Sequence, residues 1–122
     1  MSNVVQWFEI ATNDLERAKV FYAAVFQREF TFIEMPDTSM YMFSGEDEMS
    51  GSRGALVKSK DNTPSIDGTI VYFQCEDINN EISRIEAAGG KILFPKTSIG
   101  QFGFISQFID TEGNRIGIHS DK

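Results

Sequence analysis

Apolar residues repeat along this chain with two periods, and the periods predict alternating strands and helices. Residues 4–11 alternate as a half-buried strand does. From about Leu15 to Phe26, apolar residues return every three or four positions, which predicts an amphipathic helix capped by Thr12, Asn13 or Asp14. The alternation gives the strand two faces: Phe8 and Ile10 on one, and Trp7, Glu9 and Ala11 on the other.

The helix is followed by segments that predict three further strands. Residues 30–35 and 40–43 form a hairpin around a turn at 36–39, and residues 54–58 form a short strand after a polar, acidic loop. Residues 59–68 hold many turn formers and show no periodicity, which predicts a linker.

The same order of elements then returns in the second half of the chain. Residues 69–75 alternate as a strand, and an apolar helical stripe ends at Gly89-Gly90, which favours a helix C-terminus. We expect a polar loop at 95–101. The stripe consists of Ile78, Ile82, Ile85 and Ala88, and the later strands are 91–94, 102–108 and 115–120.

Each half therefore has the order strand, helix and three strands. We predict an α+β fold with one domain, in which a first module covers about 4–58 and a second about 69–120. The two modules should form a curled mixed sheet around a central cavity, with the helices on the outer face. The inner face should carry Trp7, Glu9, Tyr72, Gln74, Gly117 and His119.

Composition narrows the classes of partner. A net charge of −7 with scattered basic residues argues against nucleic acid as a partner. The chain has no apolar run long enough to span a bilayer and no signal-peptide pattern, so we expect no membrane association. A single cysteine, Cys75, fits a reducing cytoplasm.

Glu9 and the only histidine, His119, are the candidates for proton transfer. Glu9 is either an edge carboxylate that reaches water or a cavity carboxylate whose pKa burial would raise. His119 is either a hydrogen-bonded structural residue or a functional group on the inner face. If the two pair across the cavity, they would serve as acid and base or hold a polar ligand.

Other inner-face residues are candidates for ligand binding. Trp7 and Tyr72 either stack on a flat or apolar ligand or simply fill the cavity. Gln74 would add an amide. Lys96 would contact an anionic ligand from the 95–101 loop, unless it is merely solvated.

Three remaining features carry weaker interpretations. We expect Cys75 to be a buried thiol facing the helices, more plausibly inert than nucleophilic. Gly100 and Gly103 indicate either a pocket lid or a tight turn. The acidic run Glu46-Asp47-Glu48 lacks the ligand spacing of a calcium loop, so we interpret it as solvated.

The repeated order and several local motifs resemble the vicinal oxygen chelate superfamily, which includes glyoxalase I, extradiol dioxygenases and bleomycin resistance proteins. The resemblance covers about Val4 to Ser120. It implies a small-molecule ligand and a homodimer. The motifs are Phe8-Glu9-Ile10, Asp14-Leu15-Glu16-Arg17-Ala18, Phe21-Tyr22 and Asp110-Thr-Glu-Gly-Asn114.

The resemblance also implies positions for divalent-metal ligands, and this chain departs from them. In each half one ligand is expected seven residues before the helix cap, and this chain has Trp7 and Ile70 there. A third ligand is expected in the last strand, where this chain has Gly117. The strand at 54–58 offers no His, Glu or Asp for the fourth. We therefore expect no metal cofactor, with a divalent metal as the alternative.

Three functions remain open on this basis. The first is a glyoxalase-like small-molecule-binding protein without the usual metal centre. The second is a metal-independent lyase or isomerase that uses Glu9 and His119 as acid and base. The third is a divalent-metal glyoxalase or dioxygenase with an atypical ligand set.

Overall fold

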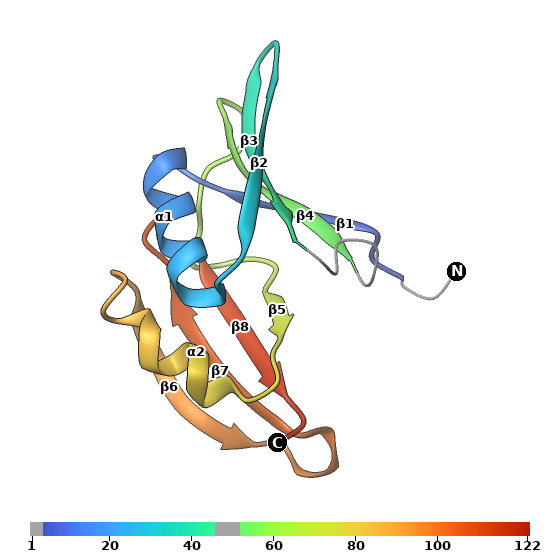
Figure 1. Cartoon of the computed structure of the whole chain (residues 1–122), viewed down its shortest axis with the longest axis vertical. Helices are drawn as coiled ribbons and strands as arrows, with labels where there is room; N and C mark the ends of the chain where they lie inside the picture. The colour runs from blue at the N-terminus through green and yellow to red at the C-terminus, as the bar shows by residue number, and fades with distance from the viewer. Residues whose placement is uncertain (1–3, 46–51) are drawn as a thin grey trace.

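The computed structural model describes residues 4–45 and 52–122 (Figure 1). The acidic run Glu46-Asp47-Glu48 lies outside these residues. The first module contains β1 (Trp7–Ala11), α1 (Leu15–Phe26), β2 (Glu29–Met35), β3 (Thr38–Ser44) and β4 (Arg53–Ser59). The second contains β5 (Val71–Gln74), α2 (Ile78–Ile85), β6 (Lys91–Ser98), the short 3-10 helix η1 (Gly100–Phe102), β7 (Phe104–Ile109) and β8 (Arg115–Ser120). The predicted α+β fold of two strand–helix–three-strand modules is confirmed.

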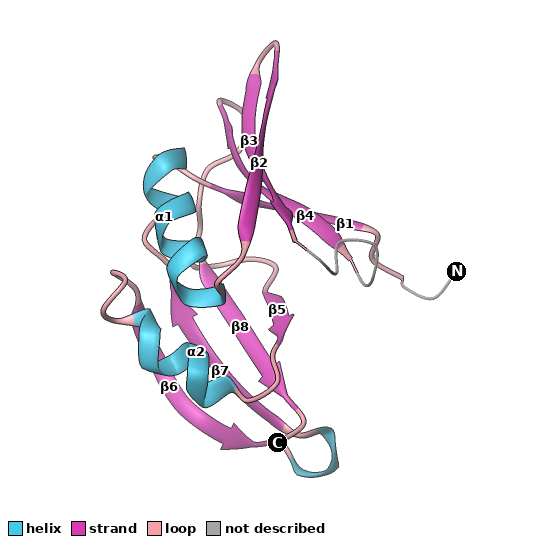
Figure 2. Cartoon of the chain, viewed as in Figure 1, coloured by secondary structure: helices cyan, strands magenta, loops and turns pink. Residues whose placement is uncertain are grey.

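Hydrogen bonding divides the strands into two four-stranded sheets (Figure 2). The first has the order β1-β4-β3-β2 and the second the order β5-β8-β7-β6. In each module the first strand runs parallel to the last, and the remaining pairs are antiparallel. The two modules therefore share one topology, as the repeated sequence pattern predicts.

The main core lies between the helices and the sheets and includes residues of both modules. Figure 1 shows α1 beside the first sheet and α2 across the second. Phe21 and Tyr22 of α1 are almost fully buried, as are Phe108 and Ile118 of the second sheet. Burying such rings and branched chains is the main stabilising contribution to folding. The opposite sheet faces remain available for a site.

Two aspartates begin the helices. The Asp14 side chain accepts a hydrogen bond from the Arg17 N–H at 3.0 Å, and the Asp77 side chain accepts from the Asn79 N–H at 3.0 Å. Each satisfies a backbone donor that the first helical turn leaves unpaired. Of the three cap residues predicted for the first helix, the structure thus identifies Asp14.

The turn between β7 and β8 joins the two modules. Glu112 in this turn accepts the backbone N–H groups of Asn13 at 2.9 Å and Asp14 at 2.8 Å. The Arg17 guanidinium donates to the same carboxylate through Nε at 2.8 Å and Nη2 at 3.1 Å. Glu112 thus holds the N-terminus of α1 against the second module. We call this set of contacts the Glu112 clamp.

The clamp requires an ionised carboxylate. Burial by itself raises the pKa of Glu112, but hydrogen bonds from Arg17, Asp14, Thr111 and Asn13 outweigh that effect and lower the pKa from 4.5 to about 2. Because these donors favour the charged form, the contact is intact at neutral pH.

Asp110 of the same turn is also buried. Its Oδ2 accepts the Tyr22 hydroxyl at 2.7 Å, and its Oδ1 accepts the N–H groups of Glu112 and Asn114, each at 2.9 Å. Burial, together with the Asp110 charge, raises the pKa of Tyr22 well above its ordinary value. The turn is therefore tied to α1 by a second, buried contact.

Some predicted boundaries are wrong. The predicted loop at 95–101 is strand to Ser98, and the register between β6 and β7 shifts between Phe94 and Thr97. Such an irregularity accommodates Pro95, which has no N–H to donate to the ladder. At the N-terminus, β1 begins at Trp7, and Val4 is 94% exposed.

Candidate functional site

A pocket of about 500 Å³ lies on the first sheet, on the face opposite the helices. Its size is within the range of small-molecule sites. All four strands of the sheet and the residues after β4 contribute to it. It is lined by Trp7, Glu9, Ile33, Met35, Thr38, Met40, Val57, Ser59, Asp61 and Asn62.

The strand register explains the apolar floor of this pocket. Met40 of β3 is paired with Ile33 of β2 on one side and with Val57 of β4 on the other. Directly paired residues of a sheet point to the same face. Met40 and Val57 are also buried, so the three side chains form a continuous apolar surface across the middle of the sheet.

Trp7 and Glu9 form the β1 side of the pocket. The indole Nε1–H donates to Glu9 Oε2 at 3.1 Å, which fixes the two side chains relative to each other. Both residues are exposed, and Trp7 retains 40% of its surface. Glu9 is thus a carboxylate that lines the pocket and also reaches water.

The equivalent face of the second sheet is filled differently. Tyr72 lies over Gly117, where an added Cβ would overlap the tyrosine ring. The Gln107 amide donates to the Tyr72 hydroxyl at 2.6 Å and holds the ring in this position. Tyr72 therefore covers the surface that Gly117 leaves open, although 43% of the residue remains exposed.

His119 lies near the end of the same face, between two oxygen atoms. Its Nδ1 is 2.7 Å from Gln74 Oε1, and its Nε2 is 2.6 Å from the Phe102 carbonyl oxygen. The carbonyl only accepts, so this contact requires a proton on Nε2. Nδ1 either donates to the Gln74 amide oxygen or, with the amide turned, accepts from its NH₂ group. Both ring nitrogens are therefore engaged within the chain.

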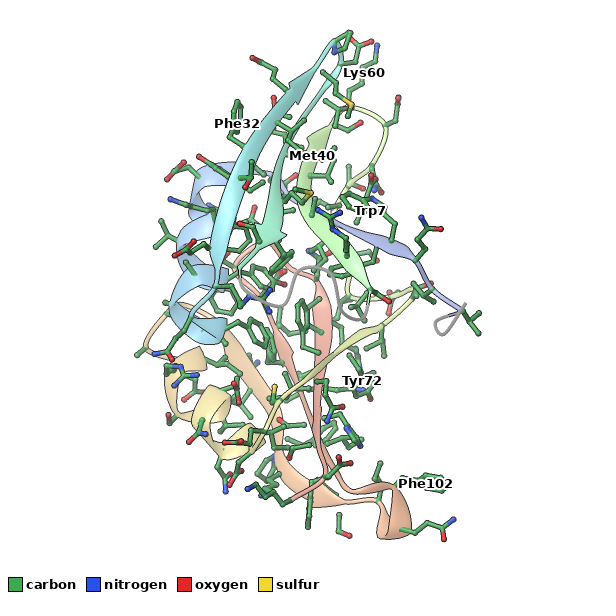
Figure 3. All side chains as sticks on the ribbon, turned by 45° about the vertical axis from the view of Figure 1, so that its right-hand side comes forward. Trp7, Phe32, Met40, Lys60, Tyr72 and Phe102 are labelled. Atoms are coloured by element: carbon green, nitrogen blue, oxygen red, sulfur yellow. The ribbon has the colours of Figure 1, made fainter. Side chains whose placement is uncertain are left out.

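The structure does not bring Glu9 and His119 together. Glu9 belongs to the first sheet and bonds Trp7, whereas His119 belongs to the second sheet and bonds Gln74 and Phe102. Figure 3 likewise shows Trp7 beside the first sheet and Tyr72 beside the second. The predicted inner-face residues form two separate groups in one chain.

Lys96 lies away from both groups of inner-face residues. Its Nζ donates to Asp77 Oδ1 at 3.1 Å and lies 4.7 Å from the centre of the Phe104 ring. Hydrogen bonding from Asn79 and Lys96 lowers the pKa of Asp77. Lys96 thus supports the first turn of α2 from a strand, where the sequence predicted a loop residue.

The structure also shows the Gly100–Gly103 segment and the Cys75 thiol. Gly100 and Gly103 both have positive φ, and the Gly103 N–H donates to the Gly100 carbonyl at 3.2 Å, so they form a tight turn before β7. Cys75 belongs to the main core, and burial raises the pKa of its thiol from 9.0 to about 12. That thiol is protonated at neutral pH and is a poor nucleophile.

Sequence reasoning misses most of the pocket. It does not distinguish the floor residues Ile33 and Met40, or the rim residues Thr38 and Asp61, from ordinary strand and linker residues. The alternating pattern of the 30–43 hairpin does indicate which of these residues share a face of the sheet. Ile33 and Met35 share one face of their strand, and Met40 and Met42 share one face of theirs. Only the register shows that these two sets adjoin Trp7 and Glu9.

The positions expected for metal ligands hold Trp7, Ile70 and Gly117, whose side chains offer no suitable donor. In residues 4–45 and 52–122, no three His, Cys, Asp or Glu side chains are grouped to hold a metal ion. No helix within these ranges is both long enough and apolar enough to cross a membrane.

Comparison with known proteins identifies a family. Residues 4–118 match the sequence model of the Glyoxalase/Bleomycin resistance protein/Dioxygenase superfamily. None of the curated proteins matches the chain.

Solved structures of similar fold share little sequence with the chain. A glyoxylase/bleomycin resistance protein/dioxygenase domain from Frankia sp. EAN1pec superposes with a TM-score of 0.77 at 16% identity, covering 100% of this chain and 99% of that one. The trypanothione-dependent glyoxalase I of Leishmania major superposes with a TM-score of 0.75 at 17% identity, covering 98% of this chain and 88% of that one.

Glyoxalase I mutant V278E from Zea mays gives a TM-score of 0.72 at 18% identity and covers 95% of this chain. The chain spans only 45% of that maize protein. At these identities the likeness establishes the fold alone.

Proposed function

We propose that this chain, which belongs to the glyoxalase/bleomycin resistance protein/dioxygenase superfamily, binds a small organic molecule in the pocket of its first sheet. The observation that carries the proposal is the pocket itself. It joins an apolar floor of Ile33, Met40 and Val57 to a polar rim, a combination typical of small-molecule sites. Trp7 adds a partly exposed aromatic wall.

We further propose that binding does not use the divalent metal found in many members of the superfamily. The support comes from the side chains at the expected ligand positions. Trp7 directs its only polar hydrogen at Glu9, and Gly117 is covered by the Tyr72 ring. These residues do not fit a metal ion.

A ligand screen with a matched pair of variants tests the binding proposal. Thr38 lines the pocket, whereas its neighbour Ser39 points to the other face of β3. Compounds that raise the melting temperature should bind Thr38→Phe at least about tenfold more weakly, while Ser39→Phe should bind as the unchanged protein does. Equal binding by both variants would place the ligand elsewhere.

Metal analysis tests the second proposal independently. We expect protein purified without added metal or chelator to contain less than a stoichiometric amount of any transition metal. Ligand-induced stabilisation should also be the same with and without EDTA. Tightly held stoichiometric metal would overturn this part and favour a glyoxalase or dioxygenase with an atypical ligand set.

We also propose that two copies associate and that the protein works in the cytoplasm. Tyr72 leaves partly exposed aromatic surface on the second sheet, which a second copy would cover. An acid–base reaction by Glu9 and His119 requires this association of two copies. Within one chain the two residues lie in different sheets, where Glu9 bonds Trp7 and His119 bonds Gln74. Sedimentation equilibrium should give twice the chain mass; a monomer mass would exclude both the association and the acid–base reaction.

A further inference from the structure

The residues that line the pocket of the first sheet carry negative charge and no positive charge. Two of its ten lining residues, Glu9 and Asp61, are acidic, and none of the ten is basic. The lining of this pocket therefore offers a ligand two carboxylates and no cation. The negative charge of the rim determines which ligands the proposed binding function favours.

Neither carboxylate is neutralised by an ion pair in the part of the chain that the structure describes. The partner of Glu9 is the neutral indole N–H of Trp7 at 3.1 Å. The ion pairs within residues 4–45 and 52–122 include neither Glu9 nor Asp61. Both residues are exposed, so their charge is available to a ligand.

The nearest basic side chains do not change this picture. Arg53 is paired with Trp7 in the register of β1 and β4 and so lies on the same face of the sheet, but it does not line the pocket. Its Nη2 contacts the Met42 sulfur at 3.5 Å, and it takes part in none of the ion pairs within residues 4–45 and 52–122. Lys58 donates to the Asn13 carbonyl at 2.9 Å. Lys60, labelled near the tip of the sheet in Figure 3, lies between the pocket residues Ser59 and Asp61 but does not itself line the pocket.

The remaining surface suits an apolar body that carries a positive charge. An aromatic ring attracts a cation through its face, most strongly when the ring is tryptophan. Trp7 is held at its N–H edge by Glu9 and is 40% exposed in the pocket wall. Thioether groups such as that of Met40 adapt to varied apolar shapes.

We propose that the pocket selects an organic cation, in which a protonated or quaternary nitrogen is attached to an apolar or aromatic body. The nitrogen is held by the Glu9 carboxylate and the Trp7 ring, and the Asp61 carboxylate, beyond the end of β4, adds to the negative potential of the pocket. The apolar body lies on the floor of Ile33, Met40 and Val57. This inference rests on the proposed binding function and adds to it the charge of the ligand.

Three probes of one shape test the choice of charge. They are 4-phenylbutylammonium, 4-phenylbutanol and 4-phenylbutanoate, which are positive, neutral and negative. Trp7 is the only tryptophan of the chain, so its fluorescence reports binding at this pocket without labelling. We expect the ammonium probe to bind roughly tenfold more tightly than the alcohol and the carboxylate to bind most weakly.

Variants locate the effect. Glu9→Gln keeps an oxygen that can accept from Trp7 but removes the charge, and Asp61→Asn removes the other. Each should weaken the ammonium probe roughly three- to tenfold while leaving the alcohol unchanged. Glu34→Gln removes the same charge from the opposite face of β2 and should change neither affinity.

The possible results separate this inference from the function beneath it. If the alcohol or the carboxylate binds as tightly as the ammonium probe, the preference for a cation is refuted and pocket binding stands. If the preference survives both substitutions, the assignment of Glu9 and Asp61 is refuted. If no probe changes Trp7 fluorescence and the wider screen also yields no pocket ligand, both proposals fail.

Discussion

Replacing Glu112 by glutamine tests whether the Glu112 clamp stabilises the packing of the two modules. The side chain is fully buried and accepts four hydrogen bonds from Asn13, Asp14 and Arg17. The introduced amide would retain an oxygen for the backbone donors but would turn an NH₂ group toward the guanidinium. We therefore expect Glu112→Gln to destabilise the protein substantially while leaving its shape unchanged.

The size of the effect follows from the carboxyl pKa. A shift from 4.5 to about 2 spans about 2.5 pKa units, which corresponds to about 3 kcal/mol of stability at neutral pH. Arg17 is 52% exposed, so solvent screens part of its attraction. We expect Glu112→Gln to lower the free energy of unfolding by about 2 to 3 kcal/mol at neutral pH.

The pH dependence gives the sharper test. A lowered carboxyl pKa stabilises the fold fully above the ordinary value of 4.5, and this stability is lost as the pH falls toward about 2. The difference between the unchanged protein and Glu112→Gln should therefore be largest near neutral pH. It should shrink by more than about half when the pH reaches about 3.

Urea unfolding followed by far-ultraviolet circular dichroism measures both quantities. Glu16→Gln is the control, because this exposed carboxylate of α1 contacts Tyr41 and Lys19 and should change stability by less than about 1 kcal/mol. A difference for Glu112→Gln that equals the control, or that stays constant across the pH range, would refute the role of the clamp.

Three further predictions concern buried groups. Tyr22→Phe should lower the free energy of unfolding by about 1 to 2 kcal/mol because Asp110 loses the tyrosine hydrogen bond, whereas Tyr41→Phe, whose partner Glu16 is exposed, should cost less; urea unfolding compares them. Gly117→Ala should displace the Tyr72 ring and cost about 1 to 2 kcal/mol, and the cost should fall in a Tyr72→Ala background, which a double-mutant cycle measures. Cys75, whose thiol has a pKa of about 12, should resist a disulfide exchange reagent in the folded protein and react once urea unfolds it; rapid labelling without urea would contradict its burial.

The elements of the fold could be predicted from the sequence because their signals are local. Helix α1 shows its apolar stripe and its Asp14 cap within one short segment. The two halves repeat the same order, so each supports the interpretation of the other. One of the wrong boundaries, at Pro95, depends on a register shift against β7, and no local pattern reports such a shift.

The candidate site could be predicted only in part, because it depends on contacts between distant residues. The alternation of one strand identifies Trp7 and Glu9, but the floor beneath them comes from the register of β2, β3 and β4. A pairing of Glu9 with His119 would require both modules of one chain to face the same cavity. In the structure the two residues belong to different sheets. The packing of the modules involves contacts such as that between Arg17 and Glu112, which lie 95 residues apart and which no local pattern reports.

The two modules share a topology but have different chemistry on the face opposite the helices. In the first, Ala55 and Val57 of β4 are small or aliphatic, so the sheet presents an apolar floor beneath an acidic rim. In the second, Gly117 of the equivalent strand β8 is covered by Tyr72, and His119 is held by its neighbours. A duplicated fold thus need not contain duplicated sites, since the side chains on one face can change without altering the core on the other. For this chain that asymmetry directs the search for a ligand to the first sheet.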